Sequence, residues 1–522
     1  MEDWLKYKPY DSVNKSDVYY SGVVFGVRNE LKLIEKNIKT LNFNDQDYKD
    51  LCVFLVSYLE DLVSETKFWI TFVNLHKSNY AKNLPFFEIS KDYKIGKVNF
   101  EDVAFLIWYF VNCKLEVSFV GPQKDLFEYI ARAVYPILDL EYDFAPKNKL
   151  LKEIYVLEDN PDFYQSRLFI DKIFFFSYLF SHDSRQKLDK ETKIILSNTN
   201  NKDYKEQILK EFRDTLLLDS VSKLLGLNSF NWAAELLGKN HKSYQLLNND
   251  FKKFTSWFLF NGKNEKYVIL EHIASGKTIN LLKKSFDGHN ALYPNCILFI
   301  GLAFYDNEWW FSGVSMTKDF DLKLVNSEKQ SMESLKKGNK ISYDLKEAYD
   351  AILEHSEYFK EFTNGKEIVF LEKNKIDAFN RDYVDYQNFR ISTKRYLEGS
   401  NFKPTKEVEK YQPSIVKNKN VEPGFVYFNP KRGLEIGHGL NSAFPDLDNP
   451  FYIEKEENED LKFIIYSPDF STEIIYFILE KYKNKLKFVK TDMGKIILKD
   501  LDFVLKFTKG NEYFSQPNIS FK

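Results

Sequence analysis

The sequence predicts an α+β protein of several domains: a mostly helical N-terminal half, a small antiparallel β module in the middle and a small α/β domain at the C-terminus. Three observations lead to this prediction. Apolar residues recur every three or four positions through the first ~250 residues, which is the period of an amphipathic helix. Near residue 265 the period changes to two, which is the period of a strand. With 522 residues, the chain is also long enough for about three domains.

The N-terminal helices are predicted from apolar stripes and from their capping residues. Ser16 is a good N-cap for a helix whose apolar stripe begins at Tyr20. Asn99 can begin another helix, because Glu101 and Asp102 in its first turn suit the positive end of the helix dipole. Further helical patterns cover roughly 163–180, 203–225 and 231–259.

The middle of the chain is predicted to form a small, strongly twisted sheet or barrel. Tyr267–His272 and Thr278–Leu282 are strand-like runs on either side of a glycine-containing turn. Ile297–Tyr305 and Glu308–Met316 are separated by the turn-forming pair Asp306-Asn307, and this spacing predicts a β-hairpin.

The C-terminal part is predicted to mix helices and strands. Helical patterning returns around 343–397. Residues 394–422 then carry a net charge of +3 and two prolines with few large apolar side chains, which is typical of a flexible connection. Beyond them we expect strands at Phe425–Phe428, Phe463–Tyr466 and Leu486–Val489, and helices from Ser471 to about Lys485 and over about Leu498–Phe507.

These patterns divide the chain into five expected parts. They are a helical domain at 1–260, a β-hairpin or small barrel module at 261–326, a helical segment at 327–397, a linker at 398–422 and an α/β domain at 423–522.

Composition and charge exclude several classes of protein. The 48 Phe, 33 Tyr and 7 Trp make up 17% of the chain, whereas collagen-like and largely disordered chains are poor in aromatic residues. Lys and Arg number 74 against 76 Asp and Glu, so the chain lacks the overall basic excess of a dedicated nucleic-acid domain, although a local basic patch stays open. Cys52, Cys113 and Cys296 lie far apart, which argues against a disulfide framework or a cysteine zinc site and favours a reducing compartment.

The sequence predicts a cytoplasmic protein without membrane association. The N-terminal residues are acidic and then mixed, so we expect no signal peptide. The longest apolar runs, Val103–Val111 and Ile173–Phe180, are shorter than the about 20 residues that a membrane span needs. We expect both runs to be buried helix faces. The sequence leaves the oligomeric state open.

No motif for catalysis, a cofactor or a metal is complete in this sequence. Gly276-Lys277-Thr278 resembles the end of a phosphate-binding loop, but Glu271 stands where that loop needs glycine and a strand pattern follows. A strand turn with an exposed lysine explains it better. No two of the seven histidines are three or four positions apart, which excludes a helix-borne zinc site of the HExxH type. The sequence therefore indicates no cofactor and no metal, and it favours a non-enzymatic protein.

The first candidate functional region is the segment 429–452, which has little periodicity over 24 residues. Structureless stretches of this length are uncommon inside compact domains and are often functional. The alternative is an ordered surface loop held by Phe444, Phe451 and Tyr452. The segment offers weak catalytic candidates in Arg432, Glu435, His438 and Asp446, and binding candidates in Lys431, Asn441 and Asp448.

The second candidate region is the hairpin around Trp309 and Trp310, with Lys277, Lys283 and Lys284 nearby in the sequence. Adjacent residues of a strand point to opposite faces, so one tryptophan faces away from the barrel core unless another element covers it. Aromatic residues beside lysines on a small barrel can stack on nucleic-acid bases. The alternative is a tryptophan covered by a neighbouring helix.

Several strings resemble an uncharacterised family of bacterial proteins of similar length, with no assigned function. They are Trp4–Tyr10, Leu84–Phe87, Glu308–Gly313, Asn429–Glu435 and Phe444–Tyr452. The resemblance covers nearly the whole chain. It implies a bacterial cytoplasmic protein with this three-part layout and supplies no catalytic residues.

Together these observations favour a non-enzymatic cytoplasmic binding or assembly protein that engages a protein partner. Tyrosine and tryptophan are enriched at the residues that dominate protein interfaces, and both are abundant here. One alternative is nucleic-acid binding through the central β module. The other is a hydrolase-type enzyme with its site on the 429–452 segment.

Overall fold

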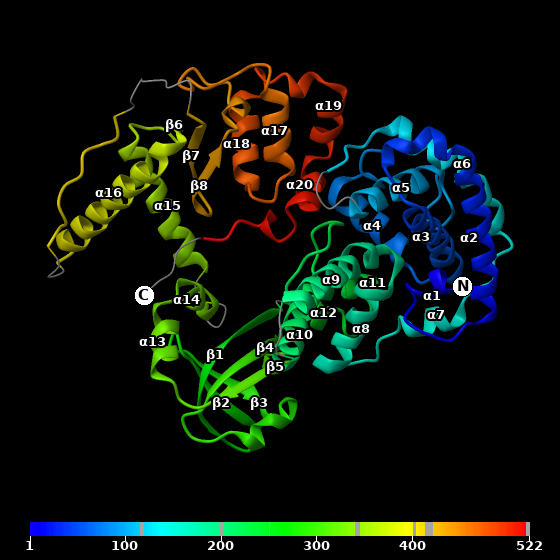
Figure 1. The fold of residues 1–522 in the computed structure, drawn as a ribbon, viewed down its shortest axis with the longest axis horizontal. Coiled ribbons are helices and arrows are strands. Elements are labelled where there is room, and N and C mark those ends of the chain that lie inside the picture. The colour runs from blue at the N-terminus through cyan, green and yellow to red at the C-terminus, as the bar shows by residue number, and fades with distance from the viewer. Residues whose placement is uncertain are drawn as a thin grey trace. The chain divides into compact units, whose positions relative to one another are not determined.

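The computed structural model describes residues 1–114, 119–198, 202–249, 251–339, 345–399, 403–412 and 421–517. The chain folds into two compact units, residues 1–342 and residues 343–522. Helices predominate in the first unit before a β module, and the second unit holds a smaller sheet, which confirms the predicted α+β class (Figure 1). Residues 400–402 and 413–420 of the expected linker lie outside the described residues.

The first unit starts with helices packed around the almost entirely buried α3 and α5. Asn14, Asn44 and Asp162 each form a capping box, at the starts of α2, α3 and α8. The expected N-cap Ser16 therefore lies inside the first turn of α2. The helices are α1 (Glu2–Leu5), α2 (Lys15–Ile34), α3 (Asp45–Ser64), α4 (Phe68–Tyr80), α5 (Phe100–Lys114), α6 (Lys124–Tyr142), α7 (Lys149–Ile154), α8 (Phe163–Phe176), α9 (Tyr178–Asn198), α10 (Lys202–Leu218), α11 (Ser229–Leu237) and α12 (Tyr244–Leu247).

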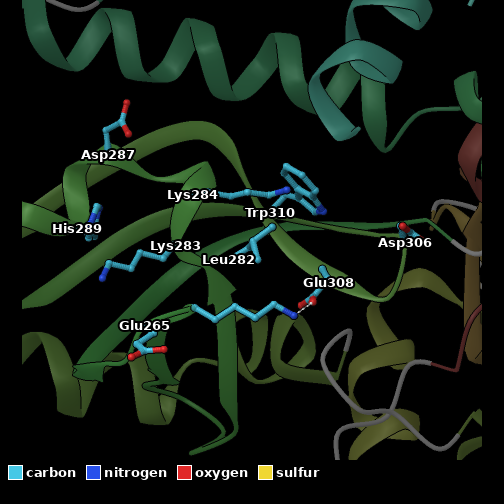
Figure 2. Close-up of a pocket in the computed structure, with 10 residues that line it drawn as sticks. Glu265, Leu282, Lys283, Lys284, Asp287, His289, Asp306, Glu308 and Trp310 are labelled. Atoms are coloured by element: carbon cyan, nitrogen blue, oxygen red, sulfur yellow. Dashed lines mark hydrogen bonds and ion pairs between the residues drawn. The ribbon is translucent and has the colours of Figure 1, made fainter. Parts of the chain in front are cut away.

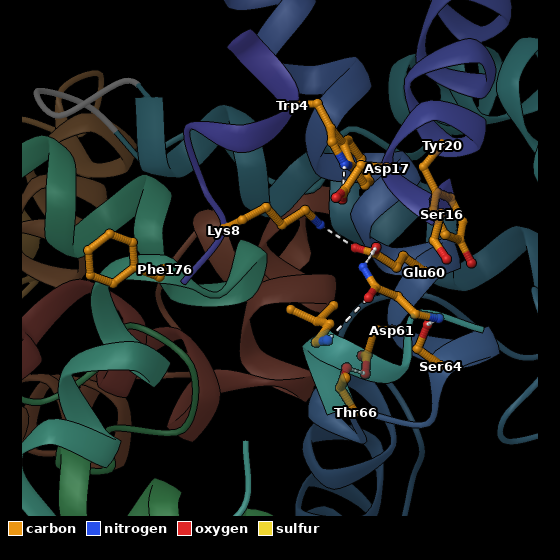
Figure 3. A network of polar contacts seen from close by, with 12 residues as sticks. Trp4, Lys8, Ser16, Asp17, Tyr20, Glu60, Asp61, Ser64, Thr66 and Phe176 are labelled. Carbon is orange, nitrogen blue, oxygen red and sulfur yellow. Dashed lines mark hydrogen bonds and ion pairs between the residues drawn. The ribbon is translucent and has the colours of Figure 1, made fainter. Parts of the chain in front are cut away.

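A buried polar network fixes the N-terminal segment against α3 (Figure 3). Lys8 forms an ion pair with Glu60, and both side chains are almost completely buried. The other Glu60 oxygen accepts a hydrogen bond of 2.9 Å from Asn148. The Lys8 ammonium also lies 3.8 Å from the ring centroid of Trp4, whose indole N–H donates to Asp17 at 2.9 Å. The N-terminal segment Trp4–Tyr10 therefore contributes Trp4, Tyr7 and Lys8 to the buried interior of the first unit.

The β module is a closed five-stranded barrel. Its strands are β1 (Lys252–Lys263), β2 (Tyr267–His272), β3 (Thr278–Leu282), β4 (Ile297–Tyr305) and β5 (Glu308–Lys318), in the order β1-β2-β3-β5-β4. The predicted β4–β5 hairpin is confirmed, and Asp306 and Asn307 have the positive φ values, 49° and 58°, that such two-residue turns require. The module is mixed rather than purely antiparallel, because β3 and β5 run parallel where Leu281 pairs with Trp309.

Helix α8 seals the junction between β3 and β5. The Tyr164 hydroxyl lies 3.0 Å from the Phe311 carbonyl of β5 and 2.8 Å from the Ser285 carbonyl that follows β3. Arg167, one turn later, donates to the Ser312 carbonyl and pairs with Asp214 of α10. Side chains of α8 thus bind two carbonyls of β5 beside the short β3–β5 contact.

The strand β1 occupies sequence that we expected to be helical. The helical pattern predicted over 231–259 ends at Leu247 with α12, and β1 begins at Lys252. Phe254, Phe258 and Phe260 of this strand all enter the barrel core. Their spacing of four and two residues fits either period, so the sequence pattern alone was ambiguous.

The first unit ends with α13 (Leu322–Gln330) and α14 (Met332–Asn339). The second unit is built on an antiparallel sheet of three strands in the order β6-β7-β8. Its elements are α15 (Leu345–Phe362), β6 (Ile368–Glu372), α16 (Ile376–Leu397), β7 (Pro423–Asn429), β8 (Gly433–His438), α17 (Glu457–Tyr466), α18 (Thr472–Tyr482), α19 (Asp492–Lys499) and α20 (Leu501–Lys509).

Helices cover both faces of this sheet, and successive residues of the central strand β7 alternate between them (Figure 1). Val426 and Phe428 join the core that α15 and α16 form on one face. Phe425 contacts Phe470 just before α18, and Tyr427 contacts Phe477 within α18. The continuous apolar run of β7 follows from this burial on both sides.

Three elements of the second unit differ from the prediction. Phe463–Tyr466, predicted as a strand, is the last part of α17, because Leu461, Ile464 and Ile465 face the core at helical spacing. The strand predicted at Leu486–Val489 gives way to a 3₁₀ turn over Phe488–Lys490. The strand β6 interrupts the helical segment expected over 327–397. Short apolar runs do not distinguish strand from helix by periodicity alone.

Within the described parts of the chain, none of the helices combines the length and the apolar character that a membrane crossing requires. Cys52, Cys113 and Cys296 are buried and form no disulfide.

His182 is buried among aromatic side chains inside the first unit. Its ring centroid lies 4.5 Å from that of Tyr7 and 4.9 Å from that of Phe110. Its Nε2 atom has no hydrogen-bond partner among the described residues. Burial lowers the pKa of His182 to about 3, with a smaller opposing effect from Asp50.

Breaking the Lys8–Glu60 pair should destabilise the protein strongly. Lys8→Met leaves a buried carboxylate without its cation, which typically costs about 3–5 kcal/mol. The double variant Lys8→Met/Glu60→Gln removes both charges and should recover more than half of that loss. Urea unfolding followed by circular dichroism measures both effects. A double variant as unstable as the single one would contradict a charge-based role.

The buried His182 should make the protein sensitive to acid. Because its folded pKa lies below the value near 6.5 of the unfolded chain, the unfolded chain takes up the proton first. Its contribution to stability is therefore present above pH 6.5 and is lost as the pH falls toward 3, by at most about 1.4 kcal/mol per pH unit. His182→Phe should flatten the dependence of the unfolding free energy on pH between 6.5 and 4.5. His438→Gln, at an exposed position, should leave it unchanged.

Candidate functional site

A pocket of about 740 Å³ lies at one end of the barrel (Figure 2). Its walls come from the β1–β2 loop, the end of β3 with the 3₁₀ turns that follow, and the β4–β5 turn with the start of β5. Loops from distant parts of the sequence thus converge there because the barrel closes.

Charged side chains of both signs line this barrel pocket. The carboxylates are Glu265, Asp287, Asp306 and Glu308. The nitrogen bases are Lys266, Lys283, Lys284 and His289. Leu282 and Trp310 complete the lining.

Some of these charges are already paired. Lys266 and Glu308 form an ion pair of 2.6 Å across the pocket, which raises the pKa of Lys266. Lys283 donates to the backbone carbonyl of Asn264 at 3.3 Å. In contrast, Glu265, Asp287 and Asp306 have no ion-pair partner among the residues that the structure describes. They are available to a ligand.

The two tryptophans of the hairpin occupy different environments. Trp309 packs on the barrel core, with its ring centroid 5.5 Å from that of Phe254. Trp310 points the other way, is only 6% exposed, and lies 5.9 Å from the ring of Tyr164 in α8. Figure 2 shows the Lys284 side chain extending toward Trp310. Its ammonium lies 4.9 Å from the Trp310 ring centroid. The helix therefore covers the outward tryptophan, which still contributes to the lining of the pocket.

Lys277, the other lysine singled out beside the hairpin, does not line the barrel pocket. It lies in the β2–β3 turn, with its ammonium 3.4 Å from the Gly338 carbonyl. Burial lowers the pKa of Lys277.

In the second unit, Glu435 and Arg432 have structural partners. Glu435 is buried and accepts hydrogen bonds from the backbone N–H of Ser471 at 2.8 Å and from its hydroxyl at 2.6 Å. Burial raises the pKa of Glu435. Arg432 is 3.4 Å from the Glu512 carboxylate. The Glu435 carboxylate thus anchors the start of α18.

His438 and Asp446 lie apart from Glu435. His438 is three positions further along β8, so it points to the opposite face, where it is exposed beside Gly424 of β7. Asp446 pairs with Lys481 at 3.0 Å and accepts a hydrogen bond from Tyr482. The structure therefore does not bring these candidate catalytic side chains into one cleft.

The remaining candidates of the 429–452 segment also have defined roles. Asn441 is buried and donates to the Gly424 carbonyl at 2.9 Å, which ties the segment to β7. Asp448 forms an exposed ion pair with Lys366 at 3.0 Å. Lys431 pairs with Glu473 at 3.1 Å and lines a second pocket of about 690 Å³ in the second unit.

Sequence reasoning found part of the barrel pocket and missed the rest. It singled out Trp310, Lys283 and Lys284 but not the carboxylates around them. The signal was weak, because Glu265 and Asp306 look like ordinary turn residues until the barrel brings their loops together. In the parts of the chain described by the structure, no three His, Cys, Asp or Glu side chains are grouped so as to hold a metal ion.

Comparison with protein-family models matched residues 1–258 to a family described as Protein of unknown function (DUF3843). The match covers about half of the chain, whereas we expected the resemblance over nearly its whole length. It includes the N-terminal helices and the first part of β1, and it ends before the rest of the barrel. Searches among curated proteins and solved structures found no significant match.

Proposed function

The chain belongs, through residues 1–258, to the family described as Protein of unknown function (DUF3843), and on this premise we propose that it is a non-enzymatic binding protein whose barrel pocket holds a segment of a protein partner. The observation that carries the proposal is the interleaving of four carboxylates with three lysines and a histidine around a pocket of about 740 Å³.

The charges of the pocket decide between classes of ligand. A polyanion would meet the four carboxylates, and three of them have no cation of their own among the described residues. An apolar ligand would bury the carboxylates and ammonium groups that share the lining with Leu282 and Trp310. A polypeptide supplies side chains of both signs together with amide donors and acceptors. Protein interfaces use such complementarity to select their partners.

A second candidate function is binding of single-stranded nucleic acid by the barrel. The strand order β1-β2-β3-β5-β4, with β3 and β5 parallel, is that of the OB-fold. In that fold the face of strands 2 and 3 and the β1–β2 and β4–β5 loops bind oligonucleotides and oligosaccharides. Both loops border the pocket here. This support rests on an analogy of topology, because one architecture hosts many functions.

The hydrolase alternative has less support. It requires Arg432, Glu435, His438 and Asp446 to converge within hydrogen-bond reach in a cleft. Each of the three charged candidates instead has its own partner, and His438 faces away from Glu435.

We place the protein in the cytoplasm as part of the same proposal. The three cysteines are buried and unpaired, which suits a reducing compartment.

Charge reversal in the pocket should abolish partner capture. We expect Lys283→Glu/Lys284→Glu and, separately, Asp287→Lys/Asp306→Lys to lose the same captured proteins from a lysate of the source organism, with at least about a tenfold drop in recovery, because like charges placed face to face cost several kcal/mol. The control Lys36→Glu/Lys193→Glu makes the same charge change as the lysine variant, at exposed lysines outside the barrel. Quantitative mass spectrometry after gentle crosslinking measures recovery.

The same variants distinguish the two candidate functions. A nucleic-acid ligand would be lost on nuclease treatment, its binding would weaken steeply with salt, and only the lysine variant would impair it. Recovery of the same proteins by all variants would contradict a role for the pocket.

A further inference from the structure

The second unit contains a pocket whose chemistry differs from that of the barrel pocket. Its volume is about 690 Å³, and it lies between α18, the end of β7 and the segment after α20. Aromatic rings form much of its wall: Tyr349, Tyr427, Tyr476, Phe477, Tyr513 and Phe514. Phe514 is 60% exposed and Tyr476 is 39% exposed, so rings at the rim are open to a ligand.

The charged groups of this aromatic pocket are mostly negative. Glu367, Glu473 and Glu480 line it against the single cation Lys431. The Lys431 ammonium forms an ion pair of 3.1 Å with the Glu473 carboxylate. Glu367 is half-exposed and only 3.7 Å from Lys360, whereas Glu480 is exposed and has no ion-pair partner among the described residues. Glu480 is thus open to an incoming cation, and Glu367 holds only a long ion pair that a second cation could share.

Burial and the negative charge of the wall raise the pKa values of two of its tyrosines. Burial raises the pKa of Tyr427, and the carboxylates of Glu435, Glu367, Glu473 and Glu480 raise it further. Burial, Asp502 and Glu473 likewise raise the pKa of Tyr476. A cation entering the pocket would be attracted by the same carboxylates.

Two rings of the wall already hold ammonium groups. Lys506 lies 5.4 Å from the ring centroid of Tyr513, and Lys481 lies 5.3 Å from that of Phe477. Both distances are within the range of cation–π attraction. For a guest cation the exposed rings of Phe514 and Tyr476 and the carboxylate of Glu480 remain.

We propose that this aromatic pocket binds the lysine or arginine side chains of a basic polypeptide segment. The volume of about 690 Å³ admits more than one cationic side chain. Cationic side chains lie on Phe514 and Tyr476 at the rim and pair with Glu367 and Glu480. This site belongs to the second unit and does not depend on the function of the barrel.

Fluorescence anisotropy of the full-length chain with two labelled probes, an oligolysine peptide and a matched oligoglutamate peptide, tests the proposal. We expect the wild type to bind oligolysine only. Glu367→Gln/Glu480→Gln should weaken oligolysine binding about three- to tenfold, as expected for the loss of two exposed ion pairs. The matched control Asp382→Asn/Asp385→Asn removes the same charge from exposed positions of α16 and should leave the affinity unchanged.

A second pair of variants separates ring contacts from general electrostatic attraction. Phe514→Leu keeps an apolar side chain but removes the π face, and should weaken oligolysine binding about two- to fivefold. Phe514→Tyr should retain it. Because Phe514 is 60% exposed, both variants are expected to fold, which circular dichroism verifies. The proposal is overturned if oligolysine does not bind at low ionic strength, if oligoglutamate binds equally well, or if the α16 control weakens binding as much as the pocket variant.

Discussion

The hydrogen bonds from α8 to strand β5 are the constraint on which the first unit depends. β3 and β5 meet at one pair, Leu281 and Trp309, and Tyr164 and Arg167 of α8 reach β5 carbonyls just beyond it. These contacts tie the barrel to the helices at the point where its strand pairing is shortest. The same helix packs on Trp310, a residue that lines the barrel pocket. A helix far from the barrel in sequence thus contacts one of the residues that form the pocket.

Much of the fold could be predicted from periodicity, and the failures share one cause. The N-terminal helices and the β4–β5 hairpin carry strong local signals, namely apolar stripes and a two-residue turn. The failures at Phe254–Phe260 and Phe463–Tyr466 concern short apolar segments buried by partners distant in sequence. Tertiary contacts decide whether such a segment becomes a helix or a strand, because its own apolar pattern fits both. The parallel pairing of β3 with β5 is likewise a property of closure that no local pattern encodes.

The candidate sites were predictable only in fragments, because each is assembled from loops. Sequence reasoning singled out Lys283, Lys284 and Trp310 for their residue types, and these do border one pocket. It also grouped Arg432, Glu435, His438 and Asp446 because they are near in sequence, yet strand alternation sends Glu435 and His438 to opposite faces. Polar residues that are close in sequence thus need not be close in the folded structure. The aromatic pocket of the second unit was missed, apart from Lys431, because its rings come from α15, β7, α18 and the C-terminal segment.

The division into two units has a spectroscopic consequence. All seven tryptophans, at positions 4, 69, 108, 232, 257, 309 and 310, belong to the first unit, and residues 343–522 contain none. Intrinsic tryptophan emission therefore reports on the first unit alone, whereas far-ultraviolet dichroism records helices of both. Coincident unfolding transitions by the two probes would indicate a single cooperative system, and separate ones would indicate two independently melting bodies. The native tryptophans thus serve as an intrinsic probe of whether the two units unfold together or separately.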